Sequence, residues 1–324
     1  MRQVIIDSAK QLSTGLDLAK DAGTKGSFDN IIVCALGGSA LPADILLALN
    51  NITIPVIIHR DYNLPPTAGK KSLVICISYS GNTEETVSAL NEAVGKNLAV
   101  VGIASGGMVE EICKENNFPF VKIPGGIQPR SATGYIFSAL AKILENSGII
   151  ENISDEILAA QTELGKIMAD AEKDGEIIAK KLPQKLPVIY SSSGLEVLAK
   201  IWKIKFNENS KVPAFYNYFP ELNHNEMVGY SGLANLGYKN FHVIILQDPL
   251  ANPKILKRME LTSEIIMEHG GEVEIVKIKE GSLLFKIFST LLLGDWVSYY
   301  LALQYGIDPT PVAVVEAFKK SMNS

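Results

Sequence analysis

Three hydroxyl residues, Ser78, Ser80 and Thr83, form the most informative local feature of the sequence, within the run SYSGNTEET. They follow an apolar, strand-like stretch and precede a helical pattern, and ligands of open α/β sheets bind at that edge of the sheet. Hydroxyls, a close-approaching glycine and the N–H groups of a helix start suit a phosphate dianion. Helix capping alone accounts for one or two of these hydroxyls. We therefore predict phosphate binding.

A second small-residue turn, Gly37-Gly38-Ser39, follows the first strand-like stretch. Glycine there lets a ligand approach the backbone, although it also serves a plain tight turn. Arg130 lies on a further loop before a helical pattern. A lone arginine is usually solvated, but beside two ligand loops we predict that Arg130 stabilises developing negative charge. Because GxxxxGK[ST] and GxGxxG do not occur, the pattern is neither a Walker loop nor a dinucleotide fingerprint.

Acid-base residues gather in the second half of the chain. Glu208 ends a helical pattern, and PELNHNE supplies Glu221, His224 and Glu226 downstream. A carboxylate can move a proton between neighbouring carbons, and histidine acts as acid or base near neutrality. However, an isolated glutamate at a helix end is usually solvated, a lone histidine is usually structural, and HNE lacks the HExxH spacing of a zinc site. Chemistry alone leaves these roles open.

The elements that must position these residues are short apolar, β-branched runs that alternate with helical patterns. Alternation of this kind predicts parallel strands with crossover helices, and strands that are apolar on both faces lie between two helical layers. We expect α/β, doubly wound parallel sheets. The predicted strands are 30–35, 56–59, 73–78, 98–104 and 120–123, followed by 187–190, 212–218, 242–246 and 272–278.

The length of 324 residues suits two domains. We predict a first domain over 1–151, a helical linker over 152–183 and a second domain over 184–324 that ends in a helix. Both halves contain a strand, a small-residue turn and a helix, which suggests a duplicated module. The stretch 282–304 is apolar almost all round, so we expect it to be buried inside the protein or against a second subunit.

Composition restricts the class of partner. The net charge is −5 and no run is rich in Lys or Arg, which argues against nucleic acid and anionic membranes as partners. Cys34, Cys76 and Cys113 show no CxxC spacing, so they are interpreted as buried thiols of a reducing compartment. No signal sequence or membrane-spanning stretch is evident in the sequence. We expect a cytoplasmic protein with a small-molecule ligand.

Taken together, five motifs resemble the bifunctional phosphoglucose/phosphomannose isomerases, a family with two sugar isomerase (SIS) domains. The resemblance covers nearly the whole chain in the right order. It implies two flavodoxin-like three-layer sandwiches plus a C-terminal helix. The motifs are GGS from Gly37, SYSGNTEET from Ser78, QPR ending at Arg130, PELNHNE, and the tail GIDPTPVAVVEAFKK.

The resemblance implies the substrate-binding residues one by one. Ser78, Ser80 and Thr83 match the hydroxyls that bind the phosphate. Gly38 and Ser39 match a turn that contacts the substrate. The sequence departs from the family's glycine-rich first turn at Ala35 and Ala40, which puts the substrate preference in doubt and not the phosphate binding.

The catalytic residues implied by the resemblance lie mostly in the second half. Arg130 matches the arginine that steadies the enediolate, and Glu208 matches the base that shuttles the proton. His224 matches a ring-opening histidine that reaches in from the neighbouring subunit, which implies a homodimer with shared active sites. A C-terminal lysine assists ring opening, for which we choose Lys319 over Lys320.

The resulting prediction is an isomerase that interconverts glucose 6-phosphate, and mannose 6-phosphate as well, with fructose 6-phosphate. We expect it to need no metal and no cofactor. Thr310 is a candidate for a further hydroxyl contact that the sequence does not place. The alternatives are a non-catalytic phosphosugar sensor, and an isomerase of another sugar phosphate such as a heptose or an amino sugar. The sequence contains no recognisable output domain, which argues against the sensor, and no amidotransferase domain, which would have favoured an amino sugar.

Overall fold

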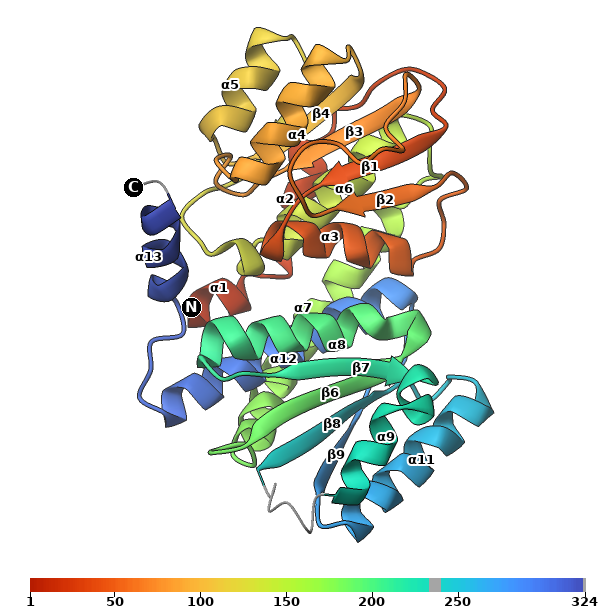
Figure 1. Cartoon of the computed structure of the whole chain (residues 1–324), viewed down its shortest axis with the longest axis vertical. Helices are drawn as coiled ribbons and strands as arrows, with labels where there is room; N and C mark the ends of the chain where they lie inside the picture. The colour runs from red at the N-terminus through yellow and green to blue at the C-terminus, as the bar shows by residue number, and fades with distance from the viewer. Residues whose placement is uncertain (233–239, 323–324) are drawn as a thin grey trace. The chain divides into compact units, whose positions relative to one another are not determined.

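A computed structural model describes residues 1–232 and 240–322 (Figure 1). The chain forms two compact units: an N-terminal unit, Ile6–Gly165, and a C-terminal unit made of Met1–Ile5 and Lys166–Ser324. The division falls inside the long helix α7 (Ser154–Ala179), which lies within the range expected to be a helical linker. Each unit contains one parallel sheet with helices on both faces, as the α/β prediction required.

The N-terminal unit has a five-stranded parallel sheet in the order β2-β1-β3-β4-β5, which is the flavodoxin-like doubly wound order. Its strands are rich in β-branched residues, and β3 is buried along its whole length. The elements are α2 (Lys10–Leu18), β1 (Asn30–Cys34), α3 (Gly37–Ala48), β2 (Val56–His59), β3 (Ser72–Ile77), α4 (Glu84–Gly95), β4 (Ala99–Ala104), α5 (Gly107–Glu115), β5 (Phe120–Lys122) and α6 (Thr133–Asn146).

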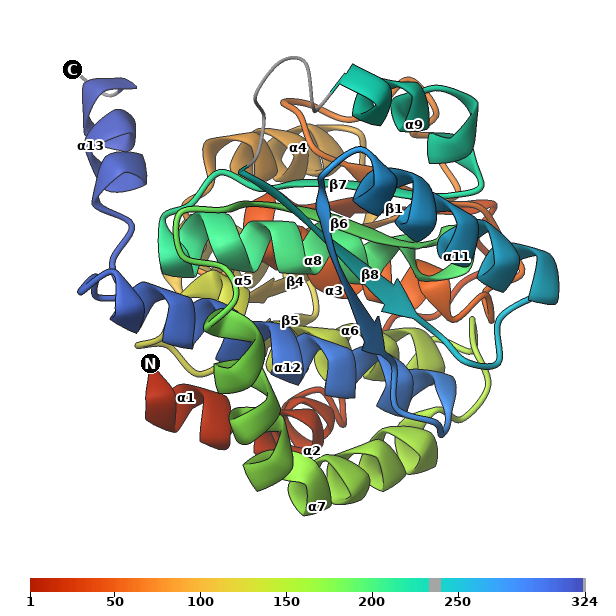
Figure 2. The same ribbon diagram turned by 90° about the horizontal axis from the view of Figure 1, so that it is seen from below.

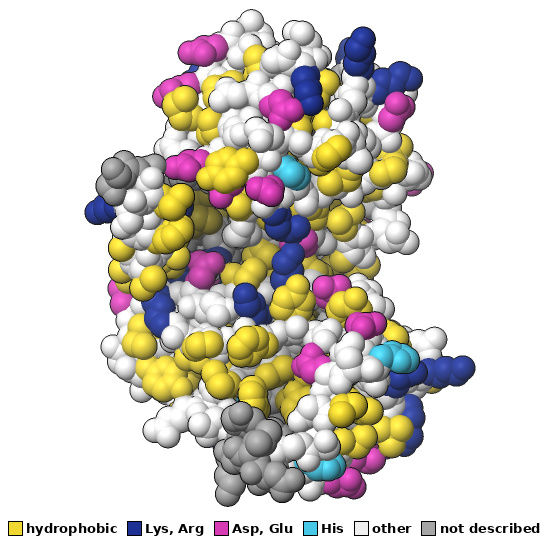
Figure 3. Space-filling model, viewed as in Figure 1, with side chains coloured by type: hydrophobic (Ala, Val, Ile, Leu, Met, Phe, Trp, Pro, Cys, Tyr) yellow, Lys and Arg dark blue, Asp and Glu magenta, His cyan; other side chains and the backbone are white. Residues whose placement is uncertain are grey.

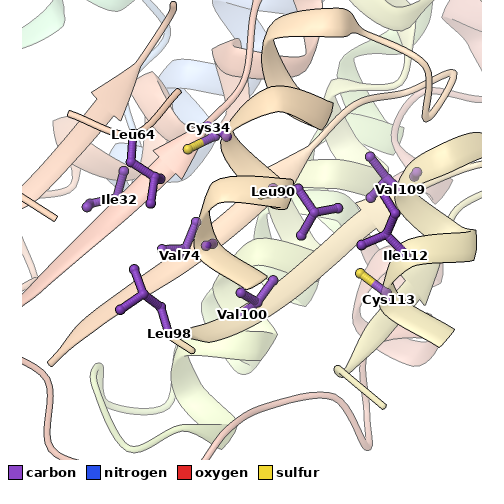
Figure 4. Close-up of a cluster of buried hydrophobic side chains, with 14 residues drawn as sticks. Ile32, Cys34, Leu64, Val74, Leu90, Leu98, Val100, Val109, Ile112 and Cys113 are labelled. Carbon is purple, nitrogen blue, oxygen red and sulfur yellow. The ribbon is translucent and has the colours of Figure 1, made fainter. Parts of the chain in front are cut away.

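Two apolar layers hold this sheet. On one face α4 and α5 pack over alternate strand residues, and Figure 4 shows Ile32, Cys34, Val74 and Val100 in one buried cluster with the helix residue Leu90. On the other side α3 packs on α6, and α6 on α2. The three cysteines are free and buried, as predicted. Burial raises the pKa of the Cys113 thiol to about 11.

The C-terminal unit repeats this topology with one strand fewer among the described residues. Its sheet order is β7-β6-β8-β9 and every pairing is parallel. It begins with α1 (Arg2–Ile6), which starts in this unit through Met1–Ile5. The remaining elements are β6 (Leu186–Ser192), α8 (Glu196–Lys205), β7 (Phe215–Phe219), α9 (Glu226–Gly229), β8 (Phe241–Gln247), α11 (Pro253–Glu268), β9 (Glu272–Lys277), α12 (Leu283–Gln304) and α13 (Ala313–Met322).

The layers of the C-terminal unit differ in composition. Helices α9 and α11 cover one face of the sheet, whereas α8 and α12 lie on the other (Figure 1). The apolar stretch 282–304 forms α12, which is buried over most of its length and packs on α8. Helix α11 begins at the N-cap Asn252, whose side chain accepts the N–H of Lys254 and precedes Pro253.

Helix α13 contrasts with α12, because none of its residues is buried. It reaches away from the end of α12 in Figure 2. Val314 and Phe318 are 84% and 64% exposed, and Figure 3 shows hydrophobic side chains gathered over this helix. In the described part of the chain, no helix combines the length and apolar character that crossing a membrane requires.

One strand prediction began too early. The range 212–218 was expected to be extended, but β7 starts at Phe215. The N–H of Val212 donates instead to the carbonyl of Phe206, and Pro213 has no N–H to offer a sheet. This shift lengthens the turn that precedes β7, which is the turn that carries Glu208.

Candidate active site

The loops after β1 and β3 meet at the topological switch point of the N-terminal sheet. Strands β1 and β3 are neighbours, and the chain leaves β1 toward β2 on one side and β3 toward β4 on the other. Ligands of doubly wound sheets bind in the crevice that this reversal opens at the carboxyl ends of the strands. The turn Gly37–Ser39 follows β1 and the loop 78–83 follows β3. Both predicted substrate-binding segments therefore share one sheet edge.

Ser78 organises the loop that contains it. Its side chain is buried, and its Oγ accepts the N–H groups of Gly81 at 3.1 Å and Thr83 at 3.3 Å. It also lies 2.8 Å from Oγ1 of Thr83, so the two hydroxyls are hydrogen-bonded. Thr83 occupies the N-cap of α4 but makes no side-chain capping bond. The first turn of α4 therefore keeps N–H groups for an anion, which favours the phosphate interpretation over simple capping.

Gly81 and Asn82 fix the loop against the start of α5. The Oδ1 of Asn82 accepts the N–H of Met108 at 3.0 Å, so this asparagine caps the neighbouring helix. Gly81 has φ +76°, and a Cβ there would meet the carbonyl oxygen of Gly106 at 1.7 Å. Glycine is required at this position both by conformation and by space. Ser80 remains exposed, with its Oγ accepting the N–H of Asn82.

Ser39 and Tyr79 connect the two loops. The Oγ of Ser39, in the first turn of α3, accepts the N–H of Tyr79 at 3.0 Å. The Tyr79 hydroxyl donates to the carbonyl of Pro124 and accepts the N–H of Ile127. Tyr79 thus joins the first turn of α3 to the loop that carries Arg130. Burial raises the pKa of Tyr79, so its hydroxyl stays protonated as the donor.

Arg130 is buried rather than solvated. It lies in the 3₁₀ turn Pro129–Ser131, and its guanidinium donates to Oε1 of Gln128 at 3.4 Å. A Cβ on Gly38 would come within 2.6 Å of the Arg130 amide nitrogen, so this backbone lies directly on the α3 turn. The Arg130 side chain is covered in this structure. Its role at the enediolate stays a prediction.

In the C-terminal unit, Glu208 lies on a π-helical turn, Phe206–Ser210, at the end of α8. π-Helical turns are rare and occur often at functional sites. The turn ends at Lys211, which has φ 58°, and the Lys211 ammonium donates to the carbonyls of Glu208 at 2.5 Å and Pro309 at 3.4 Å. Lys211 therefore connects this turn to the segment that leads into α13.

A cavity of about 640 Å³ opens beside the Glu208 turn. Glu208 and Lys211 line it on one side, and the chain between Ile307 and Val315 lines it on the other. Within that segment the Asp308 carboxylate accepts the Thr310 N–H, and this bond holds the pKa of Asp308 below its usual value. The cavity is large enough for a sugar phosphate.

His224 lies at the opposite end of strand β7 from Glu208. Glu208 precedes β7, whereas His224 follows β7 on the short 3₁₀ turn Glu221–His224 and is exposed. β7 spans five residues, or roughly 16 Å at 3.3 Å per residue. Figure 1 shows the end of α8 at the start of this strand and α9 at its arrowhead. Within one chain, the structure does not bring Glu208 and His224 together.

Lys319 and Lys320 both lie in the last turn of α13 and are exposed. The structure gives no reason to prefer one over the other, so the choice of Lys319 stays a prediction. Among residues 1–232 and 240–322, no three His, Cys, Asp or Glu side chains gather in a way that could hold a metal ion.

Comparisons with known proteins place this geometry in a family. A model of the bacterial phospho-glucose isomerase C-terminal SIS domain matches residues 171–322. A bifunctional phosphoglucose/phosphomannose isomerase of Caldicellulosiruptor bescii is 36% identical over 99% of this chain and 98% of its own length. One from Aquifex aeolicus is 34% identical over 94% and 93%. The chain belongs to the bifunctional phosphoglucose/phosphomannose isomerase family.

Solved structures support the fold of this family member. A glucosamine-6-phosphate deaminase from Thermotoga maritima superposes with a TM-score of 0.72 over 95% of each chain, at 14% identity. At that identity the likeness shows the fold and no more.

Some residues of this candidate site were not found from the sequence. Tyr79 and Asn82 lie inside the SYSGNT motif, so their positions were visible, but their partners are distant in the chain. No sequence pattern pointed to Lys211, because a lone lysine after a helix is usually solvated. Its role depends on a positive φ and on a carbonyl of Pro309 that no local pattern reveals.

Proposed function

We propose that this chain interconverts glucose 6-phosphate and mannose 6-phosphate with fructose 6-phosphate through a cis-enediol. The observation that carries the proposal is the loop 78–83, a hydroxyl-lined helix start at the switch point of a doubly wound sheet, in a chain related over its whole length to enzymes of that name.

The phosphate is held by the N-terminal unit. Hydroxyls of the loop after β3 and the first-turn N–H groups of α4 donate to its oxygens. Ser78 keeps the loop in shape from beneath, while Ser80 and Thr83 stand closer to the anion. The charge of Arg130 stabilises the enediolate.

The proton is moved by Glu208 in the C-terminal unit. Its carboxylate removes the C2 proton of the open-chain aldose as the C1 carbonyl oxygen takes up a proton, which gives the cis-enediol. The C2 hydroxyl then gives up its proton, so that one proton has passed from O2 to O1, and the same carboxyl returns its own proton to C1 to give the ketose. Glucose and mannose 6-phosphate differ only at C2. One base serves both when the pocket lets the C2–C3 bond rotate. Ala35 and Ala40 in the first turn bear on which epimer is preferred.

Ring opening requires His224, and we propose that it comes from a second copy of the chain. The support is its position. Glu208 and His224 lie at the two ends of strand β7, which is roughly 16 Å long, and that separation is beyond the reach of one substrate. Lys319 on the exposed helix α13 is the second ring-opening group. Mixing Glu208→Gln with His224→Ala subunits restores activity if each site draws on two chains, whereas inactive mixtures contradict sharing.

The decisive experiment measures fructose 6-phosphate formed from each aldose phosphate in excess EDTA, for the wild type and Glu208→Gln. We expect turnover of both sugars without added metal or cofactor, and a loss of at least about 1,000-fold in kcat in the variant, because a carboxamide cannot act as the base. Tight binding of both sugars without turnover by the wild type would overturn the proposal in favour of a phosphosugar sensor.

A further inference from the structure

The turn that carries Glu208 is anchored on both sides to helix α12. Asn209 and Ser210, which follow Glu208, are fully buried, whereas Glu208 itself is only partly covered. The Nδ2 of Asn209 donates to Oγ of Ser298 at 2.9 Å, and the Oγ of Ser210 donates to the Ser298 carbonyl at 2.7 Å. Ser298 in turn donates to the Gly294 carbonyl at 2.8 Å. One residue of α12 thus holds two consecutive residues of the turn.

The other side of the turn is held by a buried ion pair. Lys205, three residues before Glu208, lies 2.6 Å from the Asp295 carboxylate, and the two side chains are 1% and 7% exposed. Burying two charges costs several kcal/mol in desolvation, so such a pair contributes little net stability compared with an apolar core. Its geometric effect is to fix the end of α8 against α12, one turn of α12 before Ser298.

We propose that Asp295 and Ser298 are positioning residues for the base Glu208, and this proposal rests on the function proposed above. Neither residue contacts the substrate. A π-helical turn holds one residue more than a regular α-helical turn, so the loss of its anchors would let it relax to the regular form. That relaxation would rotate Glu208 away from the cavity it lines, because a one-residue change of register turns each later side chain by about 100°. The bonds to α12 hold the irregular form.

Ser298→Ala tests the proposal, with Ser289→Ala as the matched control. Ser289 is also buried on α12, but its hydroxyl donates to the carbonyl of Lys286 within the same helix. Among the described residues it makes no hydrogen bond to the Glu208 turn. We expect kcat to fall about 10- to 100-fold in Ser298→Ala, with the KM for glucose 6-phosphate within about twofold of wild type, because a misplacement of about 1 Å costs about 100-fold. Ser289→Ala should keep its kcat.

A second readout separates positioning from general damage to the fold. In D₂O, a displaced base returns its proton more slowly, so more deuterium from solvent enters C1 of the fructose 6-phosphate formed. Ser298→Ala should raise that fraction and Ser289→Ala should not. Asn209→Ala should lower kcat by a similar factor, and the double variant with Ser298→Ala should be no worse than either single one, since both remove the same hydrogen bond.

Outcomes for the two proposals are distinct. If the wild type turns over no hexose 6-phosphate, the proposed function fails. If it does turn over, but Ser298→Ala and Ser289→Ala have equal kcat and equal deuterium incorporation at a temperature where both are folded, the positioning role is wrong. A loss in Ser298→Ala confined to KM also overturns it.

Discussion

Gly38→Ala is the substitution whose effect on the site the structure defines best. A Cβ at this position would lie 2.6 Å from the amide nitrogen of Arg130 and 2.9 Å from its Cα. An ordinary contact needs about 3.4 Å, so the Arg130 loop must retreat by roughly 0.8 Å, which is overpacking that costs about 1 to 3 kcal/mol. A displacement near 1 Å at a reacting centre costs up to about 100-fold. We expect kcat/KM for glucose 6-phosphate to fall by about 30- to 100-fold.

The assay compares kcat/KM and the free energy of unfolding in urea with those of Gly95→Ala. Gly95 ends α4 in the same unit, has no heavy atom within 4 Å of a built Cβ and needs no positive φ. That control should be active and slightly more stable, because alanine is the better helix former. A Gly38→Ala enzyme with wild-type kcat/KM would refute the reasoning that this contact positions Arg130.

Two further predictions concern the phosphate loop and the start of α7. Thr83→Val removes a hydroxyl beside the proposed phosphate and should raise KM about 10-fold with kcat nearly unchanged. Thr83→Ser keeps the hydroxyl and should retain the wild-type KM. Steady-state kinetics of the two variants measures both values. Burial raises the pKa of Glu145, but hydrogen bonds from Lys142 and Ser154 outweigh it and hold the pKa below its usual value. A depressed carboxyl pKa contributes stability above the unfolded pKa that is lost as pH falls through the folded one. Glu145→Gln should therefore lower the free energy of unfolding by about 1 kcal/mol at pH 7 and by clearly less at pH 3, as measured by urea unfolding. An equal loss at pH 7 and pH 3 would contradict a lowered pKa of Glu145.

The sequence by itself determined the α/β class, the doubly wound sheets and the position of the loop at Ser78. Alternating apolar strands and helical patterns are local signals, and the loop at Ser78 follows directly from where β3 ends. The full set of motifs, from GGS to the tail, also identified the family. These features depend on neighbours within one element, and such neighbours are adjacent in sequence.

Only the tertiary structure decided how the individual side chains are used. The motif predicts the position of Ser78, but only the structure shows that its hydroxyl accepts N–H groups of its own loop, those of Gly81 and Thr83. Arg130 is covered, although lone arginines are usually solvated and nothing in the local sequence shows its burial. The anchoring of the Glu208 turn depends on Asn209 and Ser298, which are 89 positions apart. Contacts between residues so distant are set by how helices pack on a sheet, and no pattern of local spacing encodes them.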